Sequence, residues 1–245
     1  GEAGRGIMAA GQQAALGKFL AFSRVQESVA DSSGARYLSA AGITGRGSIN
    51  FFKKLQNYEF RLGIPQVDSY DRTHPLSGER ITVLEDTYKV DPAWNAPLNP
   101  KWETDFKRVK AKLQGYIADP NTTLRDYPEN DKSVPALYAR AYAWHKAAYP
   151  EKALSEANNL ISKNPSDPYF LELQGQILLE SGKPDEALTS LRKAVDLTGN
   201  QPLIAAVFGH ALIATEDKAN LAEAERVLKA AVSKDNNNPF AWYQL

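Results

Sequence analysis

The chain has 245 residues, enough to bury a sizeable core and to form one or two domains. Lysine plus arginine and aspartate plus glutamate each total 29, so no net charge steers the protein toward nucleic acid or an acidic membrane surface. Cysteine is absent, which excludes disulfides and cysteine-ligated zinc but fits a reducing or an oxidising compartment equally well.

Residues 7–22 combine apolar side chains with many alanines and glycines, which predicts closely packed helix leading into a further helical segment. That segment is expected to reach Ala41, with Gly42 as its stop signal. On this helix Glu27 and Asp31 lie at i and i+4 and share one stripe. Gly34 continues the stripe at a cost of about 1 kcal/mol relative to alanine. The glycine makes sense if another backbone crosses closely there.

Two carboxylates at this spacing allow two interpretations. They are typical of a solvated helix face. They also suit half of a zinc site, in which Glu27 is a ligand, two histidines complete the set, and Asp31 orients one of those histidines by a hydrogen bond. The chain's histidines are His74, His145 and His210, and none of them is followed by glutamate. The chain therefore contains no HExxH motif.

Ser48 is expected to cap a helix in which Ile49, Phe52 and Leu55 form a buried stripe. Residues 61–76 lack periodicity and predict an irregular loop. The loop should end at a second capping serine, Ser77, before a helix over residues 79–88.

This loop contains His74, and Pro75 favours an extended backbone at the histidine, which would let the imidazole project toward a cleft. Two roles remain open for His74. It is either a loop histidine bonded to backbone or a residue that approaches a metal or a substrate.

Residues 90–101 contain three prolines around Trp94, which predicts an extended connector and a domain boundary. Next, a helical stripe recurs over residues 102–117 at Trp102, Phe106, Val109, Leu113 and Ile117. Beside it lies a basic run of Lys107, Arg108, Lys110 and Lys112. Without an aromatic platform between the basic residues, we interpret this run as a solvated helix face rather than a nucleic-acid site.

From Val134 the sequence repeats with a period of 34, which is the tetratricopeptide period. The predicted units are 134–167, 168–201 and 202–238, with a three-residue insertion near residues 216–220 and a fourth unit starting at 239. Small residues recur where the two helices of a unit must cross closely. Five residues on the first helices are expected to line the inner surface and contact peptides: Tyr138, Tyr142, Glu172, Gln176 and His210. The alternative is that the array mainly supports the preceding domain.

Two stretches resemble one family. Ser23-Arg24, Glu27-x-x-Ala30-Asp31, Gly34 and Ala41-Gly42 resemble the third-ligand helix of the membrane-associated zinc metallopeptidases related to the CAAX prenyl proteases. The bacterial periplasmic branch fits best. A second stretch, residues 72–81 with Thr-His-Pro before an Arg-Ile helix, resembles another signature of the same peptidases.

The resemblance implies an all-α fold with the later helical half of a zinc-peptidase domain at 1–89. A connector with linking helices follows at 90–133, and a tetratricopeptide α-solenoid at 134–245. The resemblance also implies that the complete protein binds Zn²⁺, with Glu27 as a ligand and His74 as a further candidate ligand. Asp31 is expected to support the site by orienting a histidine ligand. The general-base glutamate belongs to the missing HExxH, so we expect this chain alone to be inactive.

The same resemblance implies an endopeptidase of periplasmic protein quality control, with a signal peptide upstream of this chain. Protein or peptide substrates are the expected partners, together with outer-membrane assembly machinery bound through the repeats. We expect no nucleic-acid partner, and no run approaches the roughly 20 apolar residues of a membrane-spanning helix. The alternative function is a non-catalytic tetratricopeptide-repeat adaptor or chaperone.

Overall fold

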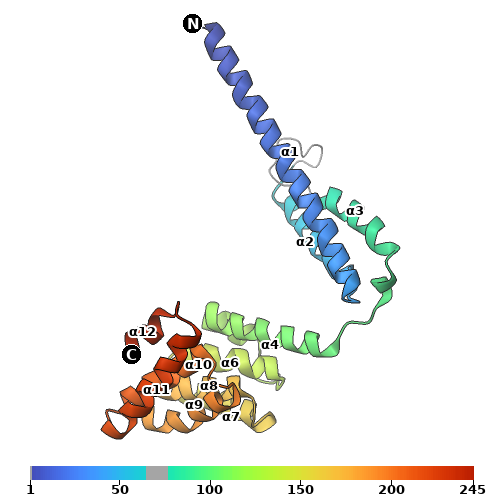
Figure 1. Ribbon diagram of the computed structural model, residues 1–245. Helices are drawn as coiled ribbons and strands as arrows, with labels where there is room; N and C mark the ends of the chain where they lie inside the picture. Colours follow the sequence, from blue (N-terminus) through green and yellow to red (C-terminus); the bar gives the residue numbers. More distant parts are fainter. Residues whose placement is uncertain (1, 65–76) are drawn as a thin grey trace. The chain divides into compact units, whose positions relative to one another are not determined.

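The computed structural model describes residues 2–64 and 77–245, and within these ranges every regular element is a helix (Figure 1). The predicted all-α fold is therefore confirmed. The chain forms two compact units, Gly1–Pro100 and Lys101–Leu245, and each is described by itself. No helix in the described ranges combines the length and the hydrophobicity of a membrane-spanning segment.

The first unit consists of α1 (Glu2–Ala40), α2 (Arg46–Arg61), α3 (Ser77–Lys89) and a short 3-10 helix, η1 (Pro92–Asn95). The two helical segments predicted before Gly42 form one continuous helix, α1. Gly42 has a φ of +67°, a conformation that glycine adopts most readily, and the Ile43 amide donates to the Leu38 carbonyl at 2.9 Å. The predicted glycine stop is confirmed.

The core of the first unit lies between α1, α2 and α3. Its buried residues are Ala35, Ile49, Phe52, Ile81, Leu84 and Tyr88. Ile49 and Phe52 are buried as predicted, but Leu55 is 40% exposed, so its assignment to the buried stripe was wrong. A step of three residues turns a helix by about 300°, so a series spaced by three drifts away from the covered side.

Neither predicted serine cap forms. Helix α2 begins two residues before Ser48, and its N-cap, Gly45, makes no side-chain cap. Ser77 is the first residue of α3, and its amide and hydroxyl both donate to the same Glu59 oxygen, at 3.1 and 2.6 Å. At the N-terminus of each helix a tertiary contact takes the place of a local cap. Glu59 accepts hydrogen bonds from Ser77 at α3, and the Tyr88 ring packs directly against Gly45 at α2.

The second unit contains α4 (Pro100–Ile117), α5 (Pro120–Asp126), three helix pairs and a final short helix. The pairs are α6 (Val134–Lys146) with α7 (Pro150–Lys163), α8 (Pro168–Glu180) with α9 (Pro184–Leu197), and α10 (Pro202–Ala214) with α11 (Lys218–Lys234), followed by α12 (Pro239–Gln244). The first helices of the pairs begin at 134, 168 and 202, which are 34 residues apart, and α12 begins 37 residues after α10. The helices therefore follow the period and the three-residue insertion read from the sequence.

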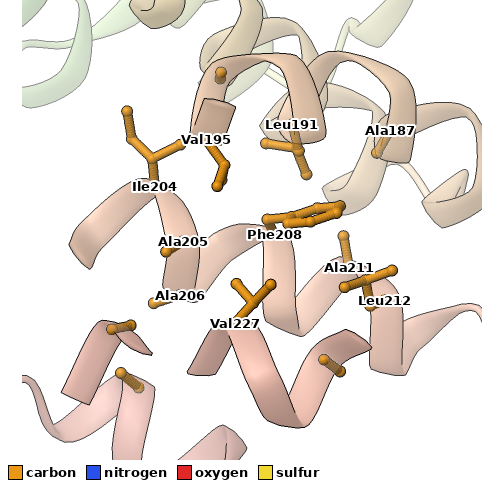
Figure 2. Packing of buried hydrophobic residues seen from close by; sticks show 14 of the residues in the cluster. Ala187, Leu191, Val195, Ile204, Ala205, Ala206, Phe208, Ala211, Leu212 and Val227 are labelled. Carbon is orange, nitrogen blue, oxygen red and sulfur yellow. The ribbon is translucent and has the colours of Figure 1, made fainter. Parts of the chain in front are cut away.

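Small residues let the helices of each pair approach closely. A Cβ atom on Gly175 would lie 2.4 Å from the Leu191 side chain, and one on Gly209 would lie 2.5 Å from Leu228. The same pairs continue into a shared core, in which Leu191 of α9 faces Phe208 of α10 (Figure 2). The expected close crossing at these glycines is confirmed.

Gly175→Ala is expected to destabilise the second unit by about 1 to 3 kcal/mol, because the added methyl group overpacks the contact with Leu191. Urea denaturation followed by circular dichroism measures the change. Gly34→Ala in α1 is the matched control, since no described atom apart from its chain neighbours and the nearby backbone of α1 lies within 4 Å of its Cβ position. It is expected to raise the stability of this chain by up to about 1 kcal/mol. Equal effects of the two variants would contradict the packing described here.

Helix α4 turns basic residues toward the helix pairs and its apolar stripe outward. Arg108 donates to both Asp167 carboxylate oxygens, at 2.5 and 2.7 Å, and its guanidinium carbon lies 4.4 Å from the centre of the Phe170 ring. Lys112 lies within 5.9 Å of three tyrosine rings. The apolar stripe is 51 to 69% exposed at Trp102, Phe106, Val109, Leu113 and Ile117. The prediction of a solvated basic face was wrong for Arg108 and Lys112. Arg108 pairs with a buried aspartate and packs on an aromatic ring, and Lys112 lies beside tyrosine rings.

Candidate functional site

Glu27 and Asp31 lie on the same side of α1, as their spacing predicts, and both meet Arg80 of α3. Arg80 Nε and Nη2 donate to the two Asp31 carboxylate oxygens at 2.7 and 2.6 Å. Arg80 Nη1 lies 3.1 Å from Glu27 Oε2. One guanidinium therefore joins both carboxylates, and this carboxylate cluster (Glu27, Asp31 and Arg80) links α1 to α3.

The carboxylate cluster is partly shielded from water, with side-chain exposures of 24% for Glu27, 15% for Asp31 and 19% for Arg80. The Arg80 guanidinium carbon also lies 4.3 Å from the centre of the Phe52 ring, so α2 supports the cation by a cation–π contact. The hydrogen bond to Asp31 raises the pKa of Arg80 above its ordinary value, against the opposing effect of burial. The arginine is therefore charged, and it offsets one of the two carboxylate charges.

No role for Arg80 was predicted from the sequence, although both carboxylates were identified. Arg80 is 49 residues from Asp31, and their pairing depends on how α1 and α3 pack, which spacing alone does not reveal. A signal was nevertheless present in the Arg-Ile pair of the second signature. Ile81 is buried in the core of the first unit, so its neighbour Arg80 is held at the edge of that core.

The residues that the structure describes do not make up a complete zinc site. They contain no group of three or more histidine, cysteine, aspartate or glutamate side chains that could hold a metal. Carboxylate oxygens suit zinc, but zinc sites use three or four protein ligands. His74, the further candidate, lies outside the described residues. Glu27 and Asp31 thus fit one part of the donor set without completing it, and their metal roles stay predictions.

Helix α4 covers two of the five residues expected to line the inner surface of the array. Tyr138 is 2% exposed and Tyr142 is 5% exposed. Tyr116 of α4 meets Tyr142 edge to face, and a Cβ on Gly115 would lie 2.9 Å from the Tyr142 Cβ. Burial raises the pKa of both buried tyrosines, so their hydroxyl groups stay protonated. Little of either side chain is accessible to a peptide in this structure.

The other three candidates are polar residues already engaged within the array. Glu172 lies 3.9 Å from a lysine of α4, and burial raises its pKa. Gln176 donates to Glu180 at 2.8 Å, and His210 Nδ1 lies 2.9 Å from Gln244 Oε1. Gln176 and His210 are 34 residues apart and occupy equivalent positions on α8 and α10. Peptide contact by any of the five stays a prediction.

Residues 3–88 match the model of peptidase family M48, and this range includes the whole carboxylate cluster. The chain is also 24% identical over 207 residues to the β-barrel assembly-enhancing protease of Yersinia pestis. That alignment covers 81% of this chain and 40% of the relative, so the chain spans less than half of the relative's length. Both comparisons relate this chain to peptidases, and the family match lies within the first unit.

Among solved structures, the chain is similar to the MamA protein, with a TM-score of 0.45 and 15% sequence identity. The similarity covers 77% of this chain and 92% of MamA.

Proposed function

We propose, from the match of residues 3–88 to peptidase family M48, that the chain is the later part of a zinc endopeptidase whose helix pairs bind proteins. The carboxylate cluster carries this proposal. Glu27 and Asp31 stand one helical turn apart inside the matched range, and Arg80 holds both of them from α3. The geometry provides a candidate carboxylate ligand whose position is set by its neighbours.

Each residue of the carboxylate cluster has its own role in the proposal. Glu27 supplies a ligand, and Asp31 orients a histidine of the complete site. Arg80 uses both Asp31 oxygens, but a carboxylate oxygen has a second lone pair, so Asp31 can still accept from an imidazole N–H. The arginine also reduces the repulsion between the two carboxylates. Zinc, when bound, polarises the scissile carbonyl and activates water.

The helix pairs of the second unit are proposed as the protein-binding part, a tetratricopeptide-type array. The relative in Yersinia pestis is named for enhancing β-barrel assembly. We therefore place the complete protein in the periplasm, in protein quality control of the bacterial envelope. Its substrates are proteins or peptides, and its repeats contact outer-membrane assembly machinery.

A non-catalytic adaptor or chaperone is the second candidate function. It rests on the helix pairs of the second unit, because a repeat array of this kind can bind proteins without an attached enzyme. The two candidates differ in what the complete protein must contain. The enzyme needs an HExxH motif outside this chain and loses activity on metal chelation, whereas an adaptor needs neither.

A zinc titration of this chain tests whether the zinc ligands are divided between this chain and the rest of the complete protein. We expect no tight zinc binding and no cleavage of casein, because Glu27 and Asp31 without histidines do not complete a three-ligand site. Isothermal titration calorimetry measures the binding, and Glu27→Gln provides the matched control. Submicromolar zinc binding that Glu27→Gln removes, or cleavage that EDTA stops, would contradict this division of the site.

A further inference from the structure

A groove of about 820 Å³ lies at the C-terminal ends of α6 and α8, beside the end of α4. Its walls include Tyr116, Tyr142, His145, Lys146, Gln176 and Glu180. The volume is within the range of roughly 300 to 1,000 Å³ that is usual for ligand sites. Gln176 is also one of the residues that the sequence suggested for peptide contact.

Glu180 presents a fixed carboxylate to this groove. His145 Nε2 lies 2.6 Å from Glu180 Oε2, and Gln176 Nε2 donates to Glu180 Oε1 at 2.8 Å. The hydrogen bond with His145, followed by that from Gln176, lowers the pKa of Glu180 against the opposing effect of burial. The side chain is 51% exposed, and each carboxylate oxygen has a second lone pair. Glu180 can therefore accept further hydrogen bonds from a bound group.

The lysine in the groove wall, Lys146, bonds to backbone carbonyls at the end of α4 rather than to Glu180. Lys146 Nζ donates to the carbonyl oxygens of Tyr116, Ile117 and Ala118 at 3.3, 3.0 and 3.0 Å. These carbonyls form the C-terminal end of α4, where a cation is favourable. In the described part of the chain, the salt bridge of Glu180 is with His145, which balances the carboxylate charge only when protonated.

An aromatic wall lines the same groove as this carboxylate. Tyr116 is 64% exposed and meets Tyr142 edge to face, with ring centroids 6.1 Å apart and planes at 88°. Aromatic rings attract guanidinium and ammonium groups, and they also cover the apolar stems of arginine and lysine. A half-exposed carboxylate and an exposed ring in one groove are thus complementary to a long basic side chain.

We propose that this groove holds an arginine or lysine side chain from an extended segment of a bound protein, with Glu180 accepting from the cation and Tyr116 covering its stem. The inference rests on the proposed role of the helix pairs in protein binding. Arginine fits better than lysine, because its planar fork donates to both oxygens of one carboxylate.

Fluorescence anisotropy with two labelled peptides and the full 245-residue chain tests the proposal. Both peptides are short and otherwise uncharged; one has a central arginine and the other has citrulline, which keeps the shape without the charge. We expect the arginine peptide to bind roughly tenfold more tightly or better. Glu180→Gln should remove this preference, and Tyr116→Ala should weaken the arginine peptide more than the citrulline peptide.

Glu186→Gln is the matched control, because Glu186 is an exposed α9 carboxylate paired with Lys183 and lies outside the groove wall. It should leave the preference unchanged. Equal binding of both peptides to the unmodified chain, or a preference that survives in Glu180→Gln, would overturn the inference while leaving protein binding by the array intact. Binding of neither peptide would also overturn the inference, and it would not bear on protein binding by the rest of the array.

Discussion

Glu27→Ala in the complete protein is expected to abolish proteolysis and zinc retention, whereas Asp31→Ala should reduce both by about 10- to 100-fold. Loss of Glu27 vacates a coordination position. Loss of Asp31 removes two hydrogen bonds of Arg80, which leaves the guanidinium with Glu27 at 3.1 Å. Arginine and metal then compete for the same carboxylate, so zinc affinity falls without disappearing.

Zinc content measured by mass spectrometry and kcat/KM for casein cleavage distinguish these outcomes. Glu85→Ala is a suitable control, since Glu85 is a carboxylate of α3 that pairs with Lys53 and Lys89 instead of Arg80. It should change neither quantity. Normal proteolysis and normal zinc content in Glu27→Ala would refute the role given to Glu27.

Arg140→Leu is expected to destabilise the second unit by about 3 to 5 kcal/mol, because it breaks a buried charge pair. Arg140 is fully buried and bonds the two Glu156 oxygens at 2.7 and 3.1 Å. Its Nη1 also donates to the carbonyls of Pro128 and Asp131 at 2.8 and 2.9 Å. Leucine would leave a mostly buried carboxylate and these loop carbonyls without their donor.

Urea denaturation followed by circular dichroism measures this loss. Arg125→Leu is the control, because the Arg125 side chain is 74% exposed. Its free energy of unfolding should stay within about 0.5 kcal/mol of that of the unmodified chain. Replacing Arg140 and Glu156 together by leucine should recover part of the loss, since no unpaired charge then remains. A loss below about 1 kcal/mol in Arg140→Leu would contradict the importance assigned to the pair.

The helix pairs could be predicted from the sequence because their signals are local and repeated. The first helix of each pair begins at a proline or at the residue before a proline. Small residues such as Gly175 and Gly209 recur 34 residues apart. Each unit thus repeats the evidence of the one before. The glycine stop at Gly42 was predictable for a similar reason, since a positive φ is a local requirement.

The environment of α4 could not be predicted in the same way. Its pattern shows an apolar stripe and a basic run, but periodicity does not say which side meets a neighbour. The side of α4 that is covered depends on residues far along the chain, because Arg108 contacts Asp167 and Phe170. The burial of Tyr138 beneath α4 follows from the same contact. Arg80 was missed for this reason as well, since its partners lie in another helix.

The most direct measurement is a crystal structure of the complete protein with zinc, in which anomalous scattering at the zinc edge locates the metal. We expect a zinc peak about 2.0 to 2.2 Å from a Glu27 carboxylate oxygen, the usual zinc–carboxylate distance. Asp31 should stay off the metal and keep its two hydrogen bonds with Arg80. A zinc peak with other ligands, with Glu27 off the metal and still paired with Arg80, would contradict the role given to Glu27.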